Sequence, residues 1–194
     1  MTDIMVFHGI TGLEPGAAGL EEALEAAGHR LHSPDLFDGH HFEDPREGFE
    51  YLEEVRFRTL AERAEEAIAD LPADTVLIGI SMGTGVATHL ARRRPETAAV
   101  VLLHAAPGRA KGEPDWPAGV PVEIHSSEGD PYFSRENADA LTAEAADGRL
   151  VLYPGSGHTF GDPLAPEDYD AEQAPVLVTN VLEFIEHETG MPTT

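Results

Sequence analysis

The sequence has 194 residues, no cysteine, and 36 acidic against 12 basic side chains, for a formal net charge of −24. So acidic a chain repels nucleic acid and anionic membranes, and we expect neither as a partner. The absence of cysteine excludes a disulfide framework, a thiolate metal site and a cysteine nucleophile. No segment has the length of a membrane span or the pattern of an export signal, so we expect a cytoplasmic protein with a single domain over residues 1–194.

In the first third of the chain, short apolar runs alternate with stretches of helical periodicity. A glycine-rich loop, residues 8–12, follows the first run, and Gly28 ends the first helical stretch. Residues 34–48 are polar and irregular, which predicts a surface excursion. The predicted elements are strands over 4–8 and 29–33 and helices over 15–27 and 49–71, the latter broken near Phe57.

The same alternation continues to the end of the chain, with a loop rich in glycine and proline over 106–119. The predicted strands are 76–78, 98–103, 120–125 and 150–153, and the predicted helices are 86–91, 135–146 and 174–187. Strands that alternate with helices indicate βαβ units. We therefore expect an α/β fold of three layers, with a mainly parallel sheet of about six strands and helices on both faces.

The stretch Gly79-Ile80-Ser81-Met82-Gly83 lies between a predicted buried strand and a predicted helix. A bare G-x-S-x-G is common by chance, but strand, turn and helix together are the context of a nucleophile elbow. Such a turn is tight enough that Gly79 and Gly83 have to lack a Cβ atom. Ser81 is therefore the candidate nucleophile.

A serine nucleophile needs a base, and the base needs an acid that holds its tautomer. In chain order an acid and then a histidine should follow, each in a loop after a later strand. Asp130 and His158 occupy such loops. Glu128 is the competing acid, and on their own Asp130 could be a turn residue and His158 a surface histidine.

The oxyanion of an acyl-transfer intermediate needs two backbone donors. The amide of Met82, directly after the nucleophile, is one candidate, and the amide of Ile10 in the first glycine-rich loop is the other. His8, His104 and His125 each end a predicted strand and are candidates for the pocket, although such histidines more often have a structural role. His40 and His41 lack further ligands nearby, so we expect no metal.

Gly83-Thr84-Gly85 also follows a strand and opens a helix, as in dinucleotide-binding proteins. The full G-x-G-x-x-G pattern is absent because residue 88 is threonine, and no acid lies about 20 residues further on. We therefore expect no nucleotide cofactor, and no cofactor of another kind.

The segments GISMGTG, EGDPYF and YPGSGHTFGDP, with PDLFDG early in the chain, resemble the dienelactone hydrolase family of α/β-hydrolases from about residue 6 to about residue 185. The resemblance implies a parallel sheet and a triad of Ser81, Asp130 and His158. The founding enzymes of that family use a cysteine nucleophile, and they hold a carboxylated lactone with arginines, one of them shortly after the catalytic histidine. Residues 159–162 of this chain contain no arginine and end in Asp162, which should repel a carboxylate.

These observations predict a serine hydrolase that cleaves a small ester, lactone or thioester through an acyl-enzyme, without a cofactor. Two alternatives stay open at this point. One is a non-catalytic protein of the same fold that binds a small ligand or a partner. The other is an acyltransferase that uses the same triad with an acceptor other than water. No pattern in the sequence indicates an oligomeric state.

Overall fold

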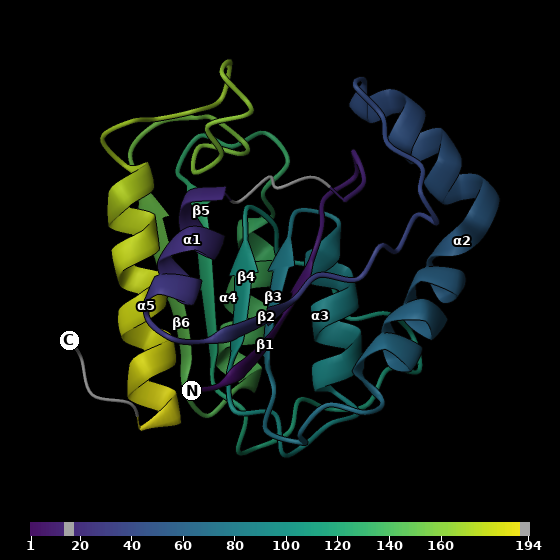
Figure 1. Ribbon diagram of the computed structural model, residues 1–194, viewed down its shortest axis with the longest axis vertical. Helices are drawn as coiled ribbons and strands as arrows, with labels where there is room; N and C mark the ends of the chain where they lie inside the picture. The colour runs from purple at the N-terminus through teal and green to yellow at the C-terminus, as the bar shows by residue number, and fades with distance from the viewer. Residues whose placement is uncertain (14–17, 191–194) are drawn as a thin grey trace.

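Within residues 1–13 and 18–190, which the computed structural model describes, the short apolar runs form six strands of one sheet. Each neighbouring pair of strands is parallel, in the order β2-β1-β3-β4-β5-β6 (Figure 1). The strands are β1 (Asp3–Phe7), β2 (Arg30–His32), β3 (Val76–Ile80), β4 (Val100–Leu103), β5 (Val122–Ser127) and β6 (Gly148–Tyr153). The predicted parallel sheet is therefore confirmed.

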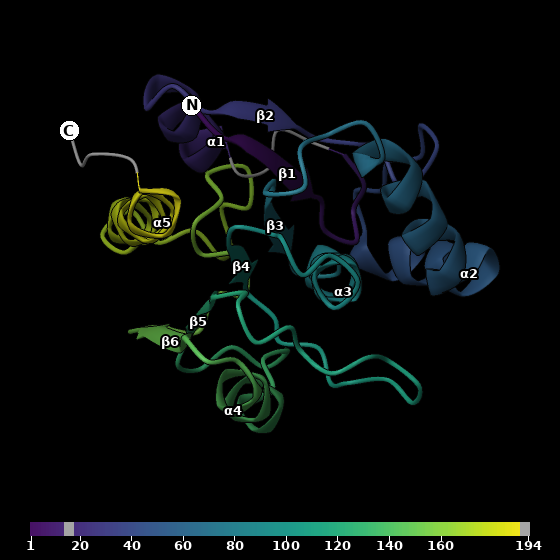
Figure 2. The same cartoon turned by 90° about the horizontal axis from the view of Figure 1, so that it is seen from below.

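Helices cover both faces of the sheet, as predicted. The helices are α1 (Ala18–Ala26), α2 (Pro45–Ile68), α3 (Gly83–Ala91), α4 (Arg135–Glu144) and α5 (Ala174–Thr189). Figure 2 shows α1 and α5 on one side of the sheet and α2, α3 and α4 on the other. Alternate residues of a strand point to opposite faces, so Ile4 and Val6 pack with α1 and α5, whereas Met5 and Phe7 join the core beneath α2, α3 and α4.

Most of the segment over residues 34–48 lies at the surface, as its polar composition predicted, but part of it does not. Leu36 and Phe37 are fully buried and belong to the core beneath α2 and α3. Helix α2 then begins at Pro45, where the carboxylate of Asp44 accepts a hydrogen bond from the amide of Arg46 at 2.9 Å. The prediction is wrong at Leu36 and Phe37, because these two large apolar side chains fold back into the core from an otherwise polar stretch.

Two breaks in the helical pattern lie where the sequence predicts them. Arg56 has φ +67° and ψ +146° inside α2, so the chain kinks one residue before Phe57. Gly28 follows α1 with φ +87°, a conformation that glycine adopts without a steric penalty. The predicted start of the first helix, Pro15, lies outside the described residues.

The carboxyl ends of parallel strands meet at one edge of a sheet, and here this edge is the top of Figure 1. The loops after β1, β3, β5 and β6 therefore lie at the same end of the molecule. Strand β5 runs to Ser127, two residues beyond its predicted end, so His125 lies within the strand. This edge is where open α/β sheets bind their ligands.

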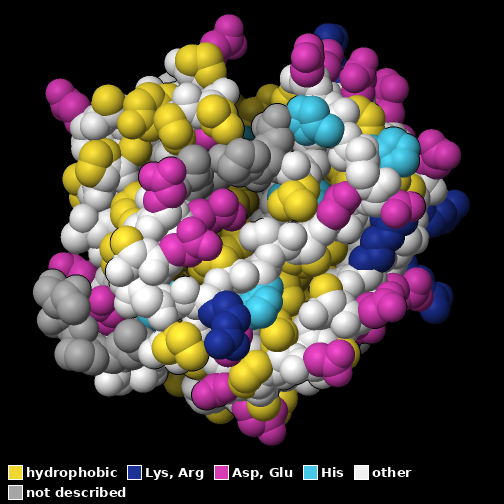
Figure 3. Space-filling view, viewed as in Figure 1, with side chains coloured by type: hydrophobic (Ala, Val, Ile, Leu, Met, Phe, Trp, Pro, Cys, Tyr) yellow, Lys and Arg dark blue, Asp and Glu magenta, His cyan; other side chains and the backbone are white. Residues whose placement is uncertain are grey.

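Acidic side chains are spread over the face seen in Figure 3, among few lysines and arginines. Among the described residues, no helix combines the length and the apolar character needed to cross a membrane.

Candidate active site

A tight turn at Ser81 joins β3 to α3. Ser81 has φ +49°, in the left-handed region that costs energy for any residue except glycine. A Cβ atom on Gly79 would lie 2.5 Å from Cα of Thr84, and one on Gly83 would lie 2.2 Å from the carbonyl oxygen of Phe7. The turn therefore has the strained backbone of an elbow, and both flanking glycines are needed because the backbone passes so close to them.

Ser81, His158 and Asp130 come together at the carboxyl edge of the sheet. Oγ of Ser81 lies 2.8 Å from Nε2 of His158, and Nδ1 of His158 lies 2.8 Å from Oδ2 of Asp130. The side chain of His158 is 17% exposed and that of Asp130 is fully buried. A base in contact with a hydroxyl, and an acid that holds the other ring nitrogen, is the arrangement that activates a serine.

The carboxylate of Asp130 has three hydrogen-bond donors. Besides His158, the amide of Tyr132 donates to Oδ1 at 2.8 Å and the hydroxyl of Ser126 donates to Oδ2 at 3.3 Å. Burial raises the pKa of Asp130, but the hydrogen bonds from His158 and Tyr132 outweigh it, so the net pKa lies below its ordinary value. Glu128, the competing acid, is exposed, and the carboxylate in contact with His158 is that of Asp130.

The loop that carries His158 is held from two sides. The hydroxyl of Ser127 donates to the carbonyl of Gly157 at 2.7 Å. Oδ2 of Asp168 accepts hydrogen bonds from both the amide and the hydroxyl of Thr159, each at 3.1 Å. Ser127 and Asp168 could not be identified from the sequence, because side-chain hydrogen bonds between loop residues leave no periodic pattern.

The two predicted oxyanion donors, the amides of Met82 and Ile10, belong to segments that adjoin Ser81. Met82 follows Ser81 directly, and Gly9 brings the other loop close, since a Cβ atom on Gly9 would lie 3.8 Å from that of Ser81. Neither amide donates a hydrogen bond to another backbone group in the described part of the chain. The loop is held by close packing, because a Cβ atom on Gly48 of α2 would lie 2.1 Å from the carbonyl oxygen of Ile10.

A cavity of about 680 Å³ opens over Ser81 and His158, and we call it the histidine-side cavity. This volume is ordinary for a small-molecule site. Among the described residues no lysine or arginine lines the cavity. The acidic residues that line it are Glu43, Asp162, Glu167 and Asp168. Its charge therefore disfavours an anionic ligand.

His8 lines this cavity and links two loops. Its Nε2 accepts a hydrogen bond from the amide of Leu36 at 3.0 Å, and its Nδ1 lies 2.8 Å from the carbonyl of Gly9. Burial lowers the pKa of His8, which outweighs the opposite effects of the Gly9 carbonyl and of Asp35. The ring is therefore neutral, and it fixes the loop that carries Ile10.

The other two histidines predicted at the pocket do not line the cavity. The ring of His104 is buried behind that of His158, with 6.0 Å between the ring centroids. His125 is fully buried within β5, where its Nδ1 lies 2.9 Å from the hydroxyl of Tyr153. Both therefore have a buried, structural environment, since His104 directly follows β4 and His125 lies inside β5.

Within the described residues, no group of three or more histidines, aspartates or glutamates could hold a metal ion. The ring of His40 stacks on that of Tyr51, with 4.5 Å between their centroids.

A strained serine between strand and helix, with an acid and a histidine after later strands of a parallel sheet, defines an α/β-hydrolase. The model of the dienelactone hydrolase family matches residues 2–189. The chain belongs to that family, which confirms the resemblance seen in the sequence motifs.

Solved structures share the fold at low sequence identity. A structure named m3DLH is 22% identical with a TM-score of 0.80, over 96% of this chain and 86% of that chain. A dienelactone hydrolase-like promiscuous phosphotriesterase from metagenomic libraries is 20% identical with a TM-score of 0.79, over 96% of this chain and 86% of that chain. A dienelactone hydrolase from Anabaena variabilis is 24% identical with a TM-score of 0.69, over 96% of this chain and 86% of that chain. A comparison with curated proteins found no match.

Proposed function

We propose that the protein is a serine hydrolase that cleaves a small ester, lactone or thioester through an acyl-enzyme on Ser81. The observation that carries this proposal is the continuous contact from Oγ of Ser81 through both ring nitrogens of His158 to the buried carboxylate of Asp130. Membership of a hydrolase family supports the general reaction. The contacts within this group of three residues support the proposed serine nucleophile.

In the proposed reaction His158 takes the proton of Ser81 as Oγ attacks the carbonyl carbon. The amides of Ile10 and Met82 donate hydrogen bonds to the oxyanion, and each such donor is typically worth about 100- to 1000-fold in turnover. His158 then gives its proton to the leaving group, and Asp130 stabilises the imidazolium in between. Water hydrolyses the acyl-enzyme with His158 again as the base.

The charge of the histidine-side cavity narrows the substrate. Four carboxylates line it and, among the described residues, no lysine or arginine does. A carboxylate-bearing lactone would be repelled there. We therefore propose that the substrate is an uncharged or cationic small molecule.

The test is intact-mass analysis after treatment with a fluorophosphonate, beside hydrolysis of p-nitrophenyl acetate. Wild type should gain one adduct and turn over the ester, and Ser81→Ala should do neither. Ser33→Ala is the matched control, because Ser33 is exposed and distant in the chain from the triad, and it should keep both the adduct and the turnover.

Folded wild type that forms no adduct at either low or high salt would overturn the proposal. The alternative hypothesis, a non-catalytic binding protein of the same fold, would then be favoured. Release of free acetic acid at the same rate as p-nitrophenol is expected, and acetyl transfer to an added alcohol in its place would indicate an acyltransferase.

A further inference from the structure

As well as the histidine-side cavity, Ser81 lines a second cavity. Its volume is about 410 Å³, and it lies on the face of the sheet that α2, α3 and α4 cover. Among Ser81, Asp130 and His158, only Ser81 lines this second cavity. We call this cavity the α3 groove. Its defining residues are Met82, Gly85, Thr88, Ala105, Leu52 and Leu141.

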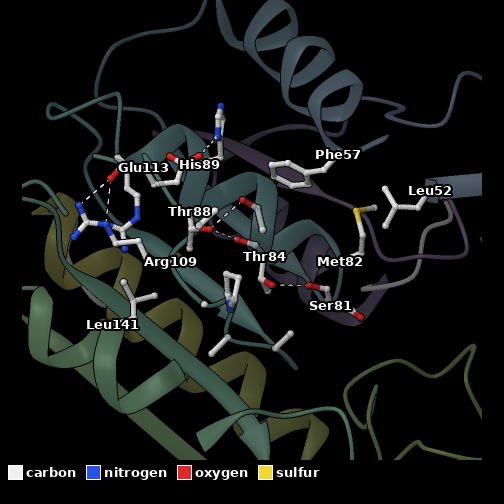
Figure 4. A pocket seen from close by; sticks show the side chains of 17 residues that line it. Leu52, Phe57, Ser81, Met82, Thr84, Thr88, His89, Arg109, Glu113 and Leu141 are labelled. Atoms are coloured by element: carbon white, nitrogen blue, oxygen red, sulfur yellow. Dashed lines mark hydrogen bonds and ion pairs between the residues drawn. The ribbon is translucent and has the colours of Figure 1, made fainter. Parts of the chain in front are cut away.

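The α3 groove follows one side of helix α3. Several of its lining residues are three or four positions apart, which is the spacing of neighbours on one side of a helix. They are Gly85, Thr88 and Arg92, and Ser81 lies just before the helix. At 1.5 Å per residue, Gly85 and Arg92 are roughly 10 Å apart along the helix axis. Figure 4 shows the same course, with Ser81 and Met82 at one end and Arg109 and Glu113 at the other.

The walls nearest the serine are largely apolar. Leu52 and Phe57 come from α2, and Ala105 follows β4. The hydroxyl of Thr84 in this part of the groove already has a hydrogen-bond partner, because it donates to the carbonyl of Ser81 at 2.6 Å. An apolar chain would lose no protein hydrogen bond on entering.

The charged residues at the far end are paired with one another or with neighbours. Arg92 donates to both carboxylate oxygens of Glu144, each at 2.8 Å. Arg109 lies 2.7 Å from Asp115, and Glu113 is paired with Arg93. The far end therefore offers no uncompensated cation to an anionic ligand, and the groove suits an uncharged chain.

We propose that the α3 groove binds the apolar acyl chain of the substrate, an inference that rests on the proposed function. During acylation the bond from Oγ of Ser81 to the carbonyl carbon forms and the bond to the leaving-group oxygen breaks. The proton that His158 took from Ser81 passes to that oxygen. The leaving group therefore lies beside His158 in the histidine-side cavity, and the acyl substituent extends from the other side of the carbonyl carbon into the α3 groove.

The test varies the acyl chain and keeps the leaving group constant, with p-nitrophenyl acetate, butyrate, hexanoate and octanoate. Each methylene buried in the groove is worth up to about fourfold in binding. The kcat/KM of wild type should rise by about tenfold or more from acetate to octanoate. Ala105→Leu narrows the groove, and it should reduce the octanoate-to-acetate ratio by about tenfold through steric exclusion of the longer chain.

Ala118→Leu makes the same chemical change at an exposed position outside both cavities, and it should keep the wild-type ratio. Ala110→Trp gives a second obstruction at an exposed residue of the α3 groove, for use if Ala105→Leu does not fold. A wild type with equal kcat/KM for all four esters, or an unchanged ratio in a folded obstructed variant, would overturn the inference. The fluorophosphonate adduct separates the two proposals. If the ester series fails but the adduct forms, only the assignment of the groove is wrong. If no adduct forms, the proposed function fails as well.

Discussion

The imidazole ring of His104 packs against that of His158, with 6.0 Å between the ring centroids. The ring of Phe160 also contacts that of His104, with 5.2 Å between the ring centroids. His104 is buried and has φ +70°. Burial, aided by the neighbouring His158, lowers the pKa of His104 to about 3. A neutral aromatic ring therefore supports His158 from behind without adding a second positive charge.

The first prediction concerns stability in mild acid. The folded-state pKa of His104, about 3, lies below its ordinary value of 6.5, so its stabilising effect is complete above pH 6.5 and is lost as the pH falls toward 3. As the pH falls from 7 to 5, the unfolded chain takes up a proton at residue 104 and the folded protein does not. This difference should lower the free energy of unfolding by about 2 kcal/mol. Urea denaturation of His104→Gln should show a pH dependence smaller by that amount.

His187→Gln is the control for this experiment, because the side chain of His187 is 71% exposed. It should keep the pH dependence of wild type. An equal pH dependence in wild type and His104→Gln would contradict the neutral state assigned to His104.

The contact among Ser81, His158 and Asp130 could be predicted from sequence because each residue follows a strand whose signal is local. Val76, Leu77 and Ile78 form an apolar run before Ser81, and parallel strands bring their carboxyl ends to one edge whatever the details of packing. Chain order then restricts the acid and the base to two loops. This part of the site follows from topology.

The features that could not be predicted depend on tertiary contacts. Leu36 and Phe37 fold into the core from a polar stretch, and no period of two or 3.6 marks them. Asp168 orders the histidine loop from nine residues away, through hydrogen bonds to Thr159. His125 reads as a strand end, but β5 pairs with β6 as far as Ser127. The local pattern of apolar and polar residues does not predict any of these contacts.

The second prediction separates the two candidate acids. Asp130→Asn should lower kcat by about 10,000-fold, because the amide holds the wrong tautomer of His158. Glu128→Gln should change kcat by less than about twofold, since Glu128 is exposed and the contact to His158 is made by Asp130. Steady-state kinetics with p-nitrophenyl acetate measures both. If Glu128→Gln lost activity and Asp130→Asn did not, Glu128 would be the acid that holds His158.

The third prediction concerns the elbow glycines. A methyl group on Gly83 would lie 2.2 Å from the carbonyl oxygen of Phe7, so Gly83→Ala has to displace β1 or α3. We expect a loss of about 3 kcal/mol or more in the free energy of unfolding, at or beyond the upper end of overpacking costs. Gly19→Ala in α1 meets nothing within 4 Å and should be neutral or stabilising by up to about 1 kcal/mol. Thermal denaturation distinguishes them, and equal melting temperatures for Gly83→Ala and wild type would contradict the close approach.

The fourth prediction concerns the ion pair that joins α3 to α4. The side chain of Arg92 is 6% exposed and contacts Glu144, and its hydrogen bonds lower the pKa of Glu144 to about 2. The pair should therefore stabilise the protein fully above pH 4.5, and this effect is lost as the pH falls toward 2. At pH 7, Glu144→Gln should cost about 1.5–3 kcal/mol, the range for hydrogen bonds to charged groups.

Asp139→Asn on the same helix is the matched control for that ion pair. Asp139 pairs with Arg135 at 2.7 Å, but both side chains are more than half exposed. Exposed pairs of this kind contribute less than about 0.5 kcal/mol. Equal losses in urea denaturation for Glu144→Gln and Asp139→Asn would show that burial of Arg92 adds nothing to the strength of the pair.

The fifth prediction is the pH dependence of catalysis. The pKa of Asp130 is held below its ordinary value, and that of His104 is lowered to about 3, so neither group changes charge between about pH 5 and pH 9. Histidine is the side chain that ordinarily changes charge in this window, and the proposed base is His158. The logarithm of kcat/KM should therefore rise with a slope of one at the acid end and reach a plateau. The profile is measured at constant ionic strength with the rate of hydroxide-catalysed hydrolysis subtracted. A rate that is flat across the window, or an acid limb with a slope of two, would mean that a lone histidine base does not govern the reaction.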